Sequence, residues 1–107
     1  MSPYDPTYSW WGIARTSALF GAGRYEEAIQ WAKRTIEVTP DFPGGWRYLA
    51  ASLAHLGRLE EARAAKDQLL QLIPHDNLRL VRGYLLSVDT DRLERYIEGL
   101  RKAGVPE

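Results

Sequence analysis

Two short stretches decide the fold: residues 23–28 read Gly-Arg-Tyr-Glu-Glu-Ala, and residues 57–62 read Gly-Arg-Leu-Glu-Glu-Ala. The stretches are identical at five of six positions and lie 34 residues apart, and the same spacing separates Pro40 from Pro74. A fixed internal spacing of this length indicates a repeat protein, in which copies of one small unit stack and bury a shared core.

Each repeat, over residues 9–42 and 43–76, has the pattern of two helices joined by a turn. The apolar residues of the second repeat recur at i, i+3, i+4 and i+7, and no segment alternates with the period of two expected of a strand. Gly57 follows this stripe as a helix-ending glycine, and glutamates open the next helix, where the helix dipole favours them. The stripe consists of Trp46, Leu49, Ala50 and Leu53.

The remaining segment, residues 77–104, departs from the repeat in sequence but keeps the pattern of a helix pair. We expect one helix from Asn77 to Leu86 and a second after Asp89, which is a favourable N-cap residue. The polar outer face of the second helix is typical of a cap that ends a stack of repeats. Its apolar stripe consists of Leu93, Tyr96, Ile97 and Leu100.

The composition is that of one globular domain, which we place over residues 1–107, with 45% apolar residues. Its 14 basic and 14 acidic side chains leave no net charge to attract nucleic acid or an anionic membrane surface. The chain has no cysteine, which rules out disulfides and thiol nucleophiles and is compatible with a cytoplasmic location. The uncharged run from Ser9 to Ala14 is too short to span a bilayer, so no membrane partner is expected.

The second repeat closely resembles the tetratricopeptide repeat, a helix–turn–helix unit of the same length. The first repeat keeps the later half of the motif but has Gly12 in place of its tryptophan and Arg15 in place of its leucine. The resemblance implies an all-α, right-handed helical-hairpin solenoid of about six helices in three antiparallel pairs, the last pair a degenerate cap. It also implies a binding scaffold for proteins. The matching residues are Trp46, Leu49, Ala50, Leu53, Gly57, Leu59, Ala62 and Pro74, with Gly23, Tyr25, Ala28 and Pro40 in the first repeat.

Residues 23–29, 46–59 and 93–107 also resemble the C-terminal repeat region of bacterial adenylate cyclase-like proteins. In those proteins a cyclase or DNA-binding domain precedes the repeats. The resemblance therefore implies a scaffold or regulatory region of a bacterial, cytoplasmic protein. The chain itself lacks the sheet pattern that a cyclase domain needs, so we expect no cyclic nucleotide synthesis from it.

No motif in the chain points to catalysis, a cofactor or a metal ion. The run Gly21-Ala22-Gly23 lacks the preceding strand, third glycine and lysine of phosphate-binding loops, so we interpret it as part of a turn. His55 and His75 are 20 residues apart and do not have metal-ligand spacing. No serine lies in a nucleophile-elbow motif. We therefore predict that the protein is not an enzyme.

The family resemblance places a concave peptide groove along the first helices of the repeats. Arg47 and Arg82 would be its cationic points, suited to a protein segment with apolar anchors and an acidic group; the alternative is that both are solvated surface arginines. The asparagines with which chaperone-binding members hold a C-terminal carboxylate are missing, which argues against a chaperone peptide. The candidate groove residues are Trp10, Ile13, Ser17, Phe20, Arg47, Ala51, Ala54, His55, Val81, Arg82 and Leu85.

The expected partner is a protein or peptide, and two further interpretations stay open. Trp10 and Trp11 lie where a preceding repeat would stack, so they favour either a homodimer or a shifted helix that buries one of them. A related class of helical repeats reads RNA, but it requires a basic surface that this neutral chain lacks. The chain could also serve as a dimerisation or capping element of a larger enzyme.

Overall fold

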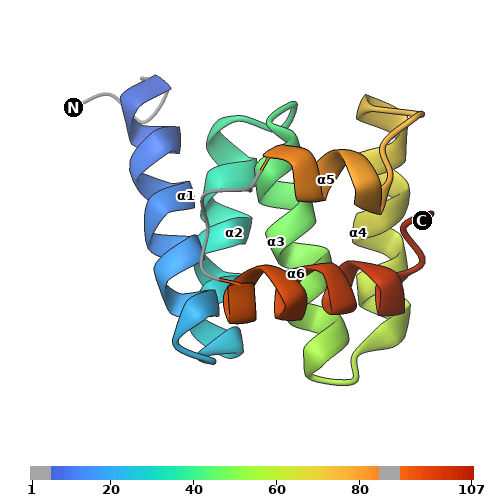
Figure 1. The fold of residues 1–107 in the computed structure, drawn as a ribbon. Helices are drawn as coiled ribbons and strands as arrows, with labels where there is room; N and C mark the ends of the chain where they lie inside the picture. The colour runs from blue at the N-terminus through green and yellow to red at the C-terminus, as the bar shows by residue number, and fades with distance from the viewer. Residues whose placement is uncertain (1–5, 85–89) are drawn as a thin grey trace.

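The computed structural model describes the backbone of residues 6–84 and 90–107, and the side chains of residues 12–83 and 90–107. Within these ranges the fold is entirely helical, without strands, as the sequence predicts. Figure 1 shows the first four helices side by side and the last two across them. The helices are α1 (Pro6–Gly21), α2 (Tyr25–Val38), α3 (Pro43–His55), α4 (Leu59–Leu72), α5 (Leu78–Tyr84) and α6 (Thr90–Ala103).

The first four helices form two antiparallel hairpins with the same turn geometry. Gly23 and Gly57 have φ angles of 77° and 79°, in the left-handed region that glycine adopts most easily. In each turn the amide after the glycine donates a hydrogen bond back into the preceding helix, from Arg24 to Leu19 O at 2.9 Å and from Arg58 to Leu53 O at 3.0 Å. Each hairpin is therefore closed by a Schellman motif, and the two glycines of the repeat have one structural role.

Small residues let the helices of each hairpin approach closely. Ala28 of α2 and Ala62 of α4 are fully buried at equivalent positions of the two repeats. Gly12 of α1 is also buried, and a side chain there would collide with Thr35 of α2. The glycine that departs from the tetratricopeptide motif thus permits close packing of α1 on α2. Trp11, one of the two tryptophans that a shifted helix would bury, has its side chain outside the described residues.

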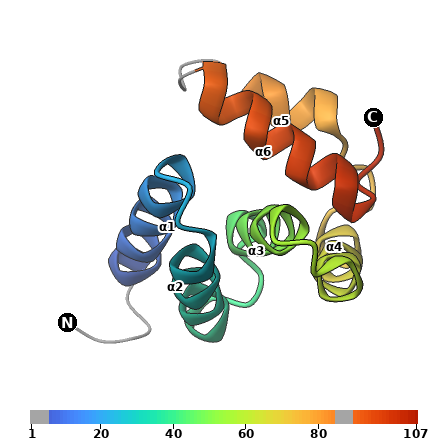
Figure 2. The same cartoon turned by 90° about the horizontal axis from the view of Figure 1, so that it is seen from below.

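The C-terminal pair covers the side of the hairpins formed by the first helices α1 and α3. Figure 2 shows α5 and α6 as a layer on that side of the other four helices. Helix α6 packs chiefly against α3, with smaller contacts to α4 and α5. The predicted apolar stripe of α6, Leu93, Tyr96, Ile97 and Leu100, is buried, which confirms the assignment of its inner face. Asp89 and the predicted end of the preceding helix lie outside the described residues.

Replacing Ala62 with leucine tests the packing within the second hairpin. Because Ala62 is fully buried, the larger side chain should overpack the core and lower the free energy of unfolding by about 1–3 kcal/mol. Ala64→Leu is the control, since Ala64 is exposed on the same helix and should tolerate the same change. Equal urea midpoints for Ala62→Leu and the parent would contradict this assignment.

Candidate peptide-binding site

The stripe of first-helix residues that the sequence assigns to a groove lies largely beneath α6. Ala51 and Ala54 of α3 are 0% and 3% exposed, and Phe20 of α1 is 0% exposed. Gly99 of α6 lies directly over this stripe: a Cβ atom there would be 2.8 Å from Ala51 O and 3.0 Å from Ala51 Cα. Because Ala51 O and Ala51 Cα are backbone atoms, they cannot rotate away from an added side chain. Only glycine at position 99 therefore permits α6 to lie this close to α3.

An aromatic cluster around Phe20 joins helices from both repeats to α6. The Phe20 ring lies 5.3 Å from Tyr25, 5.7 Å from Tyr48 and 5.7 Å from Tyr96, each in an edge-on arrangement. His55 completes the cluster, stacked on Tyr25 with ring centroids 5.0 Å apart. Edge-on pairs of this kind stabilise beyond the area they bury. Phe20 is therefore a packing centre of the fold and is not available to a ligand in this arrangement.

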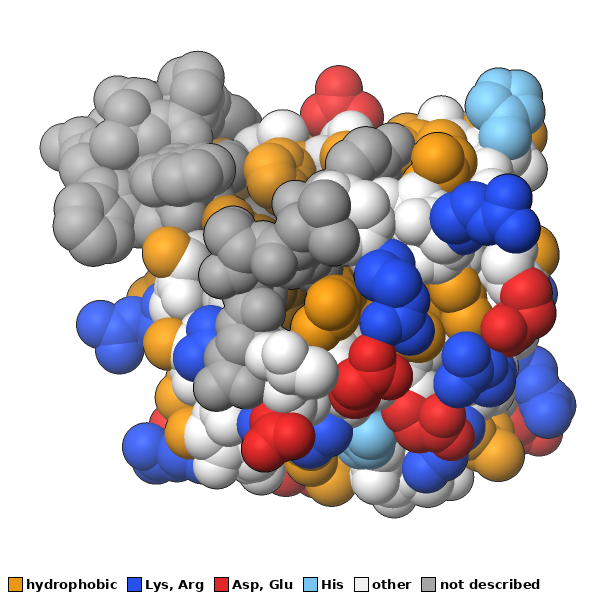
Figure 3. Space-filling model, viewed as in Figure 1, with side chains coloured by type: hydrophobic (Ala, Val, Ile, Leu, Met, Phe, Trp, Pro, Cys, Tyr) orange, Lys and Arg blue, Asp and Glu red, His pale blue; other side chains and the backbone are white. Residues whose placement is uncertain are grey.

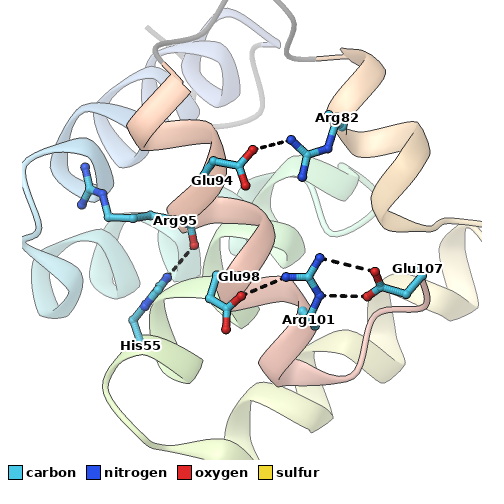
Figure 4. Close-up of polar contacts among 7 residues, drawn as sticks. All are labelled: His55, Arg82, Glu94, Arg95, Glu98, Arg101 and Glu107. Carbon is cyan, nitrogen blue, oxygen red and sulfur yellow. Dashed lines mark hydrogen bonds and ion pairs between the residues drawn. The ribbon is translucent and has the colours of Figure 1, made fainter.

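Polar contacts also hold α6 in place (Figure 4). His55 Nε2 lies 2.5 Å from the carbonyl oxygen of Arg95, and because a carbonyl only accepts, Nε2 is the donor. The Arg95 side chain donates to Gly21 O at 2.7 Å and to Phe20 O at 3.4 Å. A guanidinium at these carbonyls complements the negative C-terminal end of the α1 dipole. Helix α6 is thus anchored to both α1 and α3.

One part of the first-helix side stays open as a cavity of about 200 Å³. Helices α1, α3, α5 and α6 all contribute to its walls, which are mostly apolar and aromatic. Ile13, Arg47 and Val81 come from the predicted groove, and the cavity brings these three together. Its lining residues are Ile13, Phe42, Pro43, Gly44, Arg47, Tyr48, Val81 and Tyr96.

A buried ion pair lies beside this cavity. Arg47 Nε donates to Asp76 Oδ2 at 3.0 Å, and the two side chains are 12% and 0% exposed. Asp76 Oδ1 is also buried and has no hydrogen-bond partner among the described residues. Burial raises the pKa of the nearby Tyr96 phenol well above its ordinary value, so this group is neutral. Arg47 is thus a paired group at the cavity wall, which differs from both expectations for it, a free cationic point and a solvated arginine.

The remaining predicted groove residues are dispersed. Ser17 is half-buried and accepts a hydrogen bond from the Tyr48 hydroxyl at 3.1 Å. Arg82 is on the outer surface, where it pairs with Glu94 at 2.5 Å and lowers the pKa of that carboxyl group. The side chains of Trp10 and Leu85 lie outside the described residues.

The outer face of α6 carries compensated charges. Arg101 pairs with Glu98 and Glu107, in each case at 2.9 Å, and lowers the pKa of Glu107. Figure 3 shows acidic and basic side chains side by side over the region where α6 lies. This surface matches the polar outer face that the sequence predicts for the cap.

Sequence reasoning missed five of the cavity residues and the carboxylate beside it. Phe42, Pro43 and Gly44 precede the apolar stripe that begins at Trp46, and Tyr48 belongs neither to that stripe nor to the predicted groove residues. Tyr96 was assigned to the core of the last helix, and no role was predicted for Asp76. The available signal for Asp76 was its position two residues after Pro74, between α4 and α5, and the structure shows that it pairs there with Arg47 of α3.

The described residues provide no group of three or more His, Cys, Asp or Glu side chains placed to bind a metal ion. None of the described helices combines the length and apolar character needed to cross a membrane.

Comparison with known proteins supports the repeat assignment at a coarse level. The chain is 40% identical over 68 residues to a protein of Arabidopsis thaliana named "Protein CTR9 homolog". The aligned region covers 62% of this chain and only 6% of that protein, which contains tetratricopeptide repeats. No protein-family model matches the chain. The chain is therefore similar to part of a tetratricopeptide-repeat protein, and the comparison adds nothing in favour of a relation to adenylate cyclase-like proteins.

Gly99→Ala tests the contact between α6 and α3. In a helix interior this change normally stabilises by about 1 kcal/mol, whereas here the added methyl group meets the Ala51 backbone. We expect a net loss on the order of 2 kcal/mol in the free energy of unfolding. Gly83→Ala on α5 is the matched control, because no atom of the described residues lies within 4 Å of its Cβ position, and it should be neutral or stabilising. Equal stabilisation by both changes would show that α6 does not approach α3 at Gly99.

Arg47→Glu tests the buried ion pair. It places two carboxylates where Arg47 now binds Asp76, so we expect a loss of stability on the order of 3 kcal/mol. The double variant Arg47→Met, Asp76→Leu removes both charges and should recover much of that loss. Denaturation midpoints give the comparison. If Arg47→Glu unfolds at the same midpoint as the parent, the pair does not form in solution.

Proposed function

We propose that the chain is a non-catalytic protein-interaction module of the tetratricopeptide type, which holds one apolar side chain of a partner protein in the cavity between α1, α3, α5 and α6. The observation that carries this proposal is the convergence of four helices on one open apolar cavity. The rest of the first-helix side is filled by α6. The similarity to part of a tetratricopeptide-repeat protein supports the same class of function.

The size and charge of the cavity define its ligand. Its volume of about 200 Å³ is below the range of about 300–1,000 Å³ typical of small-molecule sites, which favours a single anchoring side chain. Because Asp76 neutralises Arg47, the wall offers little net charge, and selection should depend on apolar contact. A segment with one large apolar residue therefore fits better than an acidic one.

The other candidate functions have less support. RNA binding would need a basic surface, but the chain carries equal numbers of acidic and basic residues. Dimerisation through Trp10 and Trp11 stays a prediction, because their side chains lie outside the described residues. A place beside a cyclase-like or other enzyme domain also stays a prediction from the sequence, as do the bacterial origin and the cytoplasmic location.

Selection from a displayed peptide library tests the proposed site even though the partner is unidentified. We expect the enriched peptides to share one large apolar residue and to shift the amide signals of Tyr48 and Val81 in NMR spectra. Ile13→Glu, which places a charge in the cavity wall, should weaken their binding about tenfold or more.

Leu80→Glu is the matched control for this experiment. Leu80 is 40% exposed on α5 and does not line the cavity, so the same change should leave peptide affinity intact. Peptides that bind the Ile13→Glu variant as tightly as the parent, or a library that yields no enriched peptide, would contradict the proposed site.

A further inference from the structure

The outer edge of the first hairpin carries a tryptophan between two arginines. Arg15 of α1 and Arg34 of α2 each place the guanidinium carbon 5.0 Å from the centre of the Trp31 ring. Both arginines are exposed, and Trp31 is half-buried. Cation–π contacts of this kind hold guanidinium groups over the ring and fix their position on the surface.

The positive charges of Arg15 and Arg34 are not balanced by an acidic side chain within the described part of the chain. Neither Arg15 nor Arg34 forms an ion pair there, whereas Arg24 and Arg58 each pair with a glutamate three residues further along. Helix α1 carries no acidic residue at all. The edge therefore presents positive charge next to an aromatic surface.

The equivalent edge of the second hairpin has small or apolar residues where the first hairpin has Arg15 and Trp31. One repeat length further on, Arg15 corresponds to Leu49 and Trp31 to Ala65, which are 7% and 3% exposed. Leu49 and Ala65 lie at the junction with the first hairpin, beside Lys33 of α2. Arg34 corresponds to Gln68, which stays exposed in the second hairpin. An apolar hairpin stacked on α1 and α2 in the same way would therefore bury the Arg15 guanidinium without an acceptor, which is unfavourable. A partner that covers this edge must therefore supply an acceptor for Arg15, and a carboxylate is the strongest one.

We propose that the Arg15–Trp31–Arg34 edge is a docking surface for an acidic segment of a partner protein. Carboxylates of the segment bind the two guanidiniums in bidentate fashion, and its apolar residues pack on the exposed part of Trp31. This surface is separate from the cavity, since Ile13 and Arg15 are about 200° apart around α1. Two cations neutralise too few phosphates to hold RNA on a chain without net charge, which favours a protein segment.

Fluorescence anisotropy of a labelled glutamate-rich peptide that carries a few leucines tests the proposal. The parent chain should bind this peptide at low salt, and the same peptide with glutamine at every glutamate should not bind. The double variant Arg15→Gln, Arg34→Gln should weaken binding about tenfold or more, because two charge-assisted contacts are lost. Circular dichroism checks that the variant remains folded.

Arg63→Gln is the matched control. Arg63 is exposed on α4 and has no ion pair among the described residues. The substitution therefore removes one surface charge that is not part of the Arg15–Trp31–Arg34 edge. Full affinity in this variant supports a local site, and a loss equal to that of the double variant overturns it. The proposal is also overturned if the parent does not bind the acidic peptide, if the double variant binds as well as the parent, or if a labelled oligouridylate binds more tightly than the peptide.

Discussion

The contact between Gly99 of α6 and Ala51 of α3 constrains the rest of this structure. Backbone atoms of the two helices come so close that no side chain fits between them, and α6 can therefore cover the first-helix side of both hairpins. The burial of Phe20 and Tyr96, and the hydrogen bonds from Arg95 to the end of α1, follow from this approach. A wider separation would expose the aromatic cluster and open the predicted groove along its whole length.

This constraint also determines which surfaces are available to partners. In a stack of helical hairpins the first helices would present a long concave face, but here the chain's own C-terminal helix fills most of it. Among the described residues, an apolar cavity of about 200 Å³ stays open on this side, which we propose as the site for one anchoring side chain, and the Arg47–Asp76 ion pair borders it. The opposite side of α1 carries the charged edge around Trp31. The two surfaces differ in chemistry, one apolar and one cationic, and so suit different segments.

Much of the fold could be predicted from the sequence because its signals are local. The repeated glycines identify both turns, and the apolar stripe of the last helix identifies its buried face. The sequence does not show what that stripe packs against, since periodicity reports a face and not its neighbour. Gly99 was the available signal, a small residue between Ile97 and Leu100 at the centre of an amphipathic helix. The site was harder to predict: Ile13, Arg47 and Val81 were identified, whereas Asp76 and Tyr96 reach it only through the crossing of α6 and the turn after α4.

The most direct test of this account is a set of nuclear Overhauser effects between α6 and the first helices. The structure predicts cross-peaks between the Gly99 and Ala51 α-protons, because a Cβ on Gly99 would lie 3.0 Å from Ala51 Cα. It also predicts cross-peaks between the rings of Tyr96 and Phe20, whose centres are 5.7 Å apart. A spectrum in which Tyr96 and Gly99 show cross-peaks to α4 alone, and none to Phe20 or Ala51, would contradict the claim that α6 covers the first-helix side.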